Sequence, residues 1–141
     1  MKLNTYLSFG GQCEAAFNFY KEHLGAEITA MMTFSDGPPE ASEHMPAEWR
    51  GKIMHASLKI DGHELMGTDG MGGCGSGGDP DVGIKGAHVV IQADEPDQAD
   101  RIYAALSEGG TVEMAMDETF FARRFGMAVD RFGVPWMVLC E

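Results

Sequence analysis

Alternating and helical patterns of hydrophobic residues divide the chain into strands and helices. Residues 3–9 (LNTYLSF) alternate apolar and polar side chains, which predicts a strand with one buried face. Residues 13–24 carry apolar side chains at helical spacing and are followed by Gly25, which predicts a helix with a glycine C-cap. Further strands are predicted at residues 27–34, 52–60 and 63–67, the last two joined by an Asp-Gly turn.

The second half of the chain repeats this order of elements. A strand is predicted at residues 87–93 and a helix at 96–108, with Asp94 as its N-cap. Strands are then predicted at residues 110–116, 126–130 and 134–140. Pro135 in the last strand favours an edge position or a bulge. The order strand–helix–strand–strand–strand therefore occurs twice, as expected after a duplication. Neither half could bury its sheet face alone, whereas two such sheets can curve around one cavity.

Two segments lack these patterns. Residues 35–51 contain three prolines and many charges, which predicts an exposed loop. Residues 68–85 are rich in glycine, which predicts a flexible connection. We therefore expect one α+β domain over residues 1–141, with a first βαβββ module at about 1–67 and a second at about 86–141.

Composition excludes several classes of protein. The chain has 141 residues, of which 44% are hydrophobic, enough for one folded domain. It contains no run of about 18 apolar residues and no signal peptide, so we expect no membrane partner. Its three scattered cysteines and lack of a CxxC motif favour the reducing cytoplasm. The formal net charge of −12 disfavours nucleic acid as a partner and favours a cationic small molecule.

Several segments carry a resemblance to a known family: residues 6–9 (YLSF) with Phe19-Tyr20, 53–56 (IMHA), 118–122 (ETFFA) and 130–137 (DRFGVPWM). Together they resemble the PhnB-like branch of the vicinal oxygen chelate superfamily, which includes glyoxalase I, extradiol dioxygenases and bleomycin-resistance proteins. The last segment is the most specific. The resemblance implies a glyoxalase-like fold of two paired βαβββ modules, a homodimer, and concave sheets that form pockets for a small-molecule ligand.

The resemblance also implies where a metal ion would lie. Metal-using members place His or Gln, Glu, His and Glu on the first and last strands of the modules, where oxygen and nitrogen ligands bind a divalent ion. Here His88 matches one position, whereas Asn4 or Thr5 falls on the equivalent position of the first module. Both carboxylate positions fall on methionines, Met66 and Met137. We therefore expect no glyoxalase-type metal site and no cofactor; a divalent metal at a relocated site is the alternative.

Three titratable side chains are candidate catalytic residues. His55 shares a predicted strand face with Ser57, opposite the apolar face of that strand. His88 also lies on a strand and could act as a general base. Glu118 precedes two phenylalanines and could act as a base, a ligand or a counter-ion for a cationic group. The alternatives are structural: a histidine that orients a loop, a hydrogen-bonded strand histidine and a solvated carboxylate.

Further residues are candidate ligand contacts: Tyr6, Ser57, Thr119, Phe121 and Trp136. Tyr6 could offer its hydroxyl group to the cavity. Phe121 and Trp136 could line a pocket, although aromatic residues at strand spacing are more often core residues.

Two other motifs point away from catalysis. Gly70, Gly72 and Gly75 satisfy GxGxxG, but the residues that follow cannot form the helix that a dinucleotide site requires. Cys13 begins a predicted helix, where the helix dipole lowers the pKa of a thiol, yet it has no convincing catalytic partner. We therefore exclude nucleotide binding and favour a packing role for Cys13.

The remaining functions fall into two classes. The first is a small-molecule-binding protein of undetermined ligand without the glyoxalase-type metal site, a class that includes sequestration of a cationic antibiotic. The second is an enzyme of the lyase, isomerase or dioxygenase type, assisted by a metal at a relocated site. We rank binding first and leave catalysis open.

Overall fold

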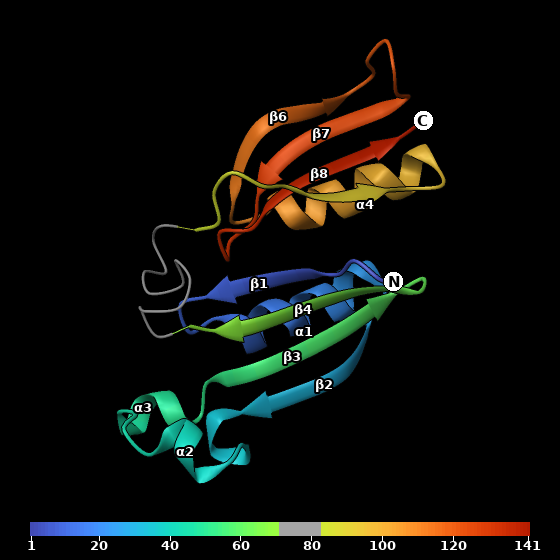
Figure 1. Ribbon diagram of the computed structural model, residues 1–141. Coiled ribbons are helices and arrows are strands. Elements are labelled where there is room, and N and C mark those ends of the chain that lie inside the picture. The colour runs from blue at the N-terminus through green and yellow to red at the C-terminus, as the bar shows by residue number, and fades with distance from the viewer. Residues whose placement is uncertain (71–82) are drawn as a thin grey trace. The chain divides into compact units, whose positions relative to one another are not determined.

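The computed structural model describes residues 1–70 and 83–141, and the chain forms two compact units, Met1–Pro80 and Asp81–Glu141. Each unit contains a four-stranded mixed sheet with a long helix on one face (Figure 1). The strand order is β1-β4-β3-β2 in the first sheet and β5-β8-β7-β6 in the second. The two units therefore have the same topology, and the predicted α+β fold of two βαβββ modules is confirmed.

The first unit consists of β1 (Thr5–Phe9), α1 (Cys13–Leu24), β2 (Glu27–Thr33), η1 (Phe34–Asp36), α2 (Pro39–Ser42), α3 (Ala47–Arg50), β3 (Ile53–Ile60) and β4 (His63–Asp69). Helix α1 begins and ends where the hydrophobic spacing predicts, and Gly25 terminates it in the left-handed conformation (φ 65°). Its buried side chains include Phe17 and Tyr20, which lie on the same side of the sheet as Ala56 and Leu58. Gly67 lets Phe17 approach closely, because a Cβ atom there would lie 2.7 Å from the ring.

The second unit consists of β5 (Val89–Gln92), α4 (Pro96–Ser107), β6 (Thr111–Asp117), β7 (Arg124–Val129) and β8 (Pro135–Cys140). Helix α4 buries Tyr103 against the sheet, where a Cβ atom at Gly126 would lie 2.8 Å from the tyrosine ring. The Tyr103 hydroxyl donates a hydrogen bond to the backbone oxygen of Met114 (3.0 Å). Burial raises the pKa of Tyr103, so the hydroxyl keeps its proton and α4 stays tied to β6.

Each unit also contains a buried carboxylate that accepts three N–H groups. Asp69 accepts hydrogen bonds from the backbone of Gly11, Cys13 and Ile53 (2.9–3.0 Å), which joins the start of α1 to β3. Asp130 accepts from Phe132, Val134 and the Trp136 ring (2.8–3.0 Å), which closes the β7–β8 turn. Such bonds satisfy backbone donors that would otherwise be buried without a partner.

The structure corrects several sequence predictions. The segment 35–51 contains the short helices α2 and α3 and is not entirely a loop. Pro135 is neither at an edge nor at a bulge: β8 lies between β5 and β7 with regular pairing, and Pro135 is its first residue, where proline is tolerated. The N-cap of α4 is Glu95, one residue after the predicted Asp94.

Only part of the predicted glycine-rich connection lies within the described residues. Strand β4 continues to Asp69, because its last two residues still pair with β1. Residues 71–82, with most of the glycine run and Cys74, lie outside the described residues. Within the described part of the chain, no helix has the length and apolar character needed to cross a membrane.

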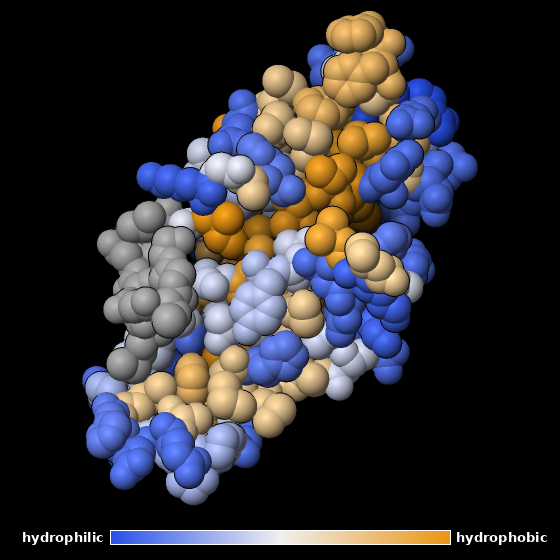
Figure 2. All heavy atoms as spheres, in the orientation of Figure 1, coloured by the Kyte–Doolittle hydropathy of each residue, from blue (hydrophilic) through white to orange (hydrophobic). Residues whose placement is uncertain are grey.

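The two sheets differ in the polarity of their surfaces. Strongly hydrophobic residues gather over β5 and β8 of the second unit, whereas the strands of the first unit show more intermediate and hydrophilic residues (Figure 2). The exposed large hydrophobic residues of the second unit include Val90, Met114 and Phe120.

Candidate ligand-binding site

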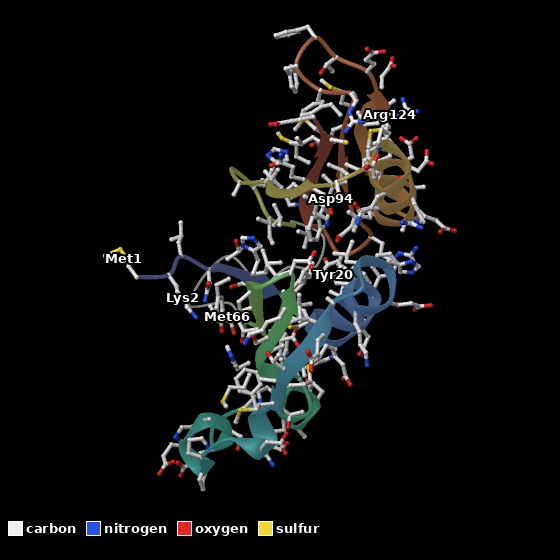
Figure 3. The ribbon with its side chains drawn as sticks, turned by 90° about the vertical axis from the view of Figure 1, so that its right-hand side faces the viewer. Met1, Lys2, Tyr20, Met66, Asp94 and Arg124 are labelled. Atoms are coloured by element: carbon white, nitrogen blue, oxygen red, sulfur yellow. The ribbon has the colours of Figure 1, made fainter. Side chains whose placement is uncertain are left out.

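The face of the first sheet that points away from α1 is continuous across all four strands. Strand pairing places Tyr6 beside Met66, Met66 beside Ser57, and His55 beside Met32. Viewed along the sheet, Met66 lies on the side opposite Tyr20 of α1 (Figure 3). Because α1 covers only the other side, we call this set of side chains the polar face of the first sheet: Tyr6, His55, Ser57, Glu64 and Met66.

Two hydrogen bonds hold a carboxylate, that of Glu64, on the polar face. Ser57 Oγ donates to Glu64 Oε1 at 2.6 Å, and Asn4 Nδ2 donates to Glu64 Oε2 at 2.8 Å. Ser57 is 3% exposed, so the first bond is shielded from water and is a short, charge-assisted one. The two bonds fix the carboxylate group on the sheet surface.

Glu64 was not among the residues selected from the sequence. The signal was present, because Glu64 alternates with Leu65 along β4 and so shares a face with Met66. Ser57, which the sequence analysis did select, is its hydrogen-bond donor. Strand alternation applied to residues 63–69 would have identified the pair.

Two aromatic rings lie on the same face. Tyr6 and His55 stack with ring centroids 6.1 Å apart and an interplanar angle of 28°. Tyr6 on β1 and His55 on β3 flank β4, and Tyr6 remains 48% exposed. An exposed aromatic ring beside a fixed carboxylate can bind a planar or cationic group through the ring face and through a charge-assisted hydrogen bond.

The other candidate histidine, His88, contacts a carboxylate, whereas His55 stacks on an aromatic ring. His88 precedes β5, and its Nε2 atom lies 3.3 Å from Glu113 Oε2 of β6. Glu113 is the extra residue of a bulge between Val112 and Met114, which re-aims its side chain. Strand alternation along β6 does not identify Glu113, because the bulge breaks that alternation.

The segment between β6 and β7 carries three more of the predicted site residues. Glu118 is exposed, and the structure shows only its backbone N–H bonded, to Asp117 Oδ1. Thr119 is engaged in its own turn, where its hydroxyl accepts the N–H of Ala122 (3.1 Å). Phe121 is half exposed and makes an edge contact with Phe125. These side chains lie near one another along the chain, and the carboxylate that contacts His88 is Glu113.

Trp136 has a core position and not the pocket-lining position considered above. It is 1% exposed, pairs with buried Ala128, and donates its ring N–H to Asp130. Ala128 alternates with Gly126, which faces α4, so Trp136 lies on the helix side of the second sheet. The side chain is therefore part of the hydrophobic core.

Cys13 is also buried, and burial together with the nearby Asp69 carboxylate raises the pKa of its thiol far above the ordinary value. This effect outweighs the helix dipole that the sequence analysis considered, so Cys13 remains a neutral core residue. A polar depression of about 240 Å³ lies near it, lined by Glu14, Glu48 and Lys52 among others, and it contains none of the predicted site residues.

Metal-binding groups are sparse in the part of the chain that the structure describes. No group of three or more His, Cys, Asp or Glu side chains there is placed to hold an ion. The family positions Met66 and Met137 carry thioethers, which do not suit a divalent ion bound by oxygen and nitrogen. These residues do not fit the family's metal.

The similarity of the chain to known proteins extends over nearly its full length. It is 35% identical over 144 residues to the Escherichia coli protein YjdN, covering 98% of this chain and 94% of that one. The crystal structure of PA1353 from Pseudomonas aeruginosa is 42% identical and superposes with a TM-score of 0.85, covering 100% of this chain and 98% of the other. The PhnB protein from Bacillus cereus, described as a putative 3-demethylubiquinone-9 3-methyltransferase, is 22% identical with a TM-score of 0.77 and full coverage of both chains, and shows the shared fold alone. Residues 2–138 match a family profile, and the chain belongs to the Glyoxalase/Bleomycin resistance protein/Dioxygenase superfamily.

Proposed function

We propose that the chain binds a small molecule on the polar face of the first sheet. The observation that carries this proposal is the Glu64 carboxylate, held by Ser57 and Asn4 beside the exposed Tyr6–His55 stack. Polar groups fixed on strands form a precise recognition surface, because neither the carboxylate nor the rings need to be ordered when a ligand arrives.

The chemistry of this face favours a ligand with a cationic or hydrogen-bond-donating group attached to a planar ring. Glu64 supplies negative charge, Tyr6 supplies an aromatic face, and Met66 supplies an adaptable thioether between them. The net charge of −12 adds a favourable long-range potential for a cation.

Binding can be tested with three probes of similar shape and different charge: benzamidine, benzyl alcohol and benzoate. We expect benzamidine to bind most tightly and to shift the NMR signals of the His55 ring. Glu64→Gln and Tyr6→Leu should each weaken benzamidine binding by about tenfold or more, whereas Glu27→Gln on the exposed start of β2 should not. Equal binding of benzoate, or unchanged affinity in Glu64→Gln, would refute the proposal.

The second candidate function is proton transfer, and the His88–Glu113 contact favours it. A carboxylate that contacts one imidazole nitrogen can orient the ring as a general base. For this function Glu118 is the further candidate acid or counter-ion. Loss of turnover of an identified substrate in His88→Gln, with benzamidine binding unchanged, would distinguish catalysis from simple binding.

A relocated divalent metal remains part of the catalytic alternative. Elemental analysis after purification without chelators should show a near-stoichiometric divalent metal if such a site exists. For the assembly we propose a homodimer in the cytoplasm, supported by the exposed aromatic side chains Phe120 and Phe121 between β6 and β7. Light scattering that gave the mass of a single 15.3 kDa chain would refute the dimer.

A further inference from the structure

The face of the second sheet that points away from α4 carries a row of methionines. Strand pairing aligns Met114 of β6 with Met127 of β7, and Met127 with Met137 of β8. Val90 of β5 completes the row beside Met137. Neighbouring strands are about 4.8 Å apart, and each sulfur atom lies at the end of a flexible side chain. The three sulfur atoms can therefore meet above β7, the middle strand of the three. Figure 3 shows sulfur atoms on this side of the second sheet.

Strand alternation fixes the direction of these side chains. Gly126 and Ala128, on either side of Met127, face the helix: a Cβ atom at Gly126 would contact Tyr103, and Ala128 is buried. Met127 and Met137 are only partly buried, and Met114 is 48% exposed. The thioethers are therefore accessible and are not needed to fill the core under α4.

A histidine and a carboxylate lie at the edges of the same face. His88 precedes β5 and Glu113 lies on β6, at opposite edges of the sheet, yet their side chains approach to 3.3 Å. Side chains from both edges therefore converge over the face that carries the methionines. Glu113 is adjacent to Met114, and His88 is two residues before Val90.

The chemistry of this group of side chains differs from that of a glyoxalase-type site. Thioether sulfur is a soft ligand that favours Cu(I) and similar monovalent ions, and imidazole also binds copper. A histidine that ligates a metal usually contacts a carboxylate through its other ring nitrogen, the arrangement that Glu113 and His88 show. We propose that Met114, Met127 and Met137, together with His88, form a binding site for a soft monovalent metal ion, Cu(I) or Ag(I).

The first sheet provides an internal control for this site. Met66 occupies the position on β4 that corresponds to Met137 on β8, but its neighbours across the strands are Tyr6 and Ser57. A single thioether without sulfur neighbours should hold such an ion only weakly. Met66→Leu is therefore a matched control for Met137→Leu.

The site can be tested by competition between the full-length protein and bicinchoninate for Cu(I) under anaerobic conditions. The titration uses a Cys74→Ser background, because a thiol would also bind the ion. We expect one ion per chain, affinity about tenfold or more weaker in Met127→Leu and in Met137→Leu, and loss of binding in the triple leucine variant. Met66→Leu should bind as the parent does. Methionine-to-leucine changes conserve volume, so the variants should fold.

A measurement without variants makes the test independent of folding. Ag(I) added to protein labelled at the methionine methyl groups should shift the NMR signals of Met114, Met127 and Met137 and leave that of Met66 unchanged. Equal affinity of the parent and the triple variant, equal weakening by Met66→Leu, or methyl shifts spread over all methionines would each overturn the proposal.

Discussion

The two sheets share one topology but differ in the chemistry of their open faces. The first sheet carries Glu64, held by Ser57, beside the Tyr6–His55 stack. At the corresponding place the second sheet carries a row of methionines. A duplicated fold constrains only the side of each sheet that packs against the helix, so the other side is free to acquire different ligands.

The helix sides of the two sheets are, in contrast, built alike. Each sheet contains a glycine that lets an aromatic side chain of the helix approach, Gly67 for Phe17 and Gly126 for Tyr103. Each unit also buries one aspartate that binds three N–H groups. Substitutions on the helix side should therefore have the larger effects on stability, and those on the open face should act mainly on binding.

The largest effect on stability is expected at Asp69, the buried carboxylate of the first unit. Asp69→Ala leaves the N–H groups of Gly11, Cys13 and Ile53 without their acceptor, which should lower the free energy of unfolding by about 3 kcal/mol or more. Urea denaturation measures this loss, and hydrogen exchange should show it in β3 and β4 first. A loss below about 1 kcal/mol would show that water replaces the carboxylate.

A smaller loss is expected at the close approach between helix and sheet. Gly67→Ala would place a Cβ atom 2.7 Å from the Phe17 ring and 3.2 Å from Cys13 Sγ, which should cost about 1–3 kcal/mol through overpacking. Gly51→Ala is the control, because no atom lies within 4 Å of a Cβ there and its φ is ordinary. Equal thermal melting temperatures of the two variants would contradict this account.

The fold could be predicted from the sequence because it depends on local signals. The helical spacing of residues 13–24 and the glycine that follows determine α1, and alternation determines most strands. Pro135 was misplaced because strand order is a tertiary property, and proline at the first position of an inner strand looks locally like proline at an edge.

The candidate site could be predicted only in part. His55, Ser57 and Tyr6 were found by alternation and share one face, whereas alternation does not identify Glu113, because of the bulge. Trp136 was considered as a pocket residue but lies in the core, because the sequence does not say which face of β8 is covered by α4. Predicting contacts between side chains on different strands requires the register of strand pairing, which short sequence patterns do not supply.

A third effect on stability depends on pH and comes from the buried thiol of Cys13. The folded state raises the pKa of Cys13 above its ordinary value of 9.0, so above that pH the unfolded chain loses a proton that the folded chain retains. Stability is therefore fully present below about pH 9 and should fall above it, by up to about 1.4 kcal/mol per pH unit. Urea denaturation between pH 8 and 10 measures the slope, and Cys13→Ala should reduce it. An unchanged slope in that variant would assign the dependence to other groups.

The smallest effects compare the two open faces directly. Glu64→Gln weakens the short bond from buried Ser57 and should cost about 1 kcal/mol of stability. Glu113→Gln disturbs only a 3.3 Å contact between partly exposed groups and should cost less than about 0.5 kcal/mol. Denaturation in 0.05 M and 0.5 M salt would compare them, because only the exposed pair should be screened. An equal loss in both variants would mean that the His88–Glu113 pair supports the second sheet as firmly as the Ser57–Glu64 bond supports the first, and that the two open faces differ less in rigidity than in ligand chemistry.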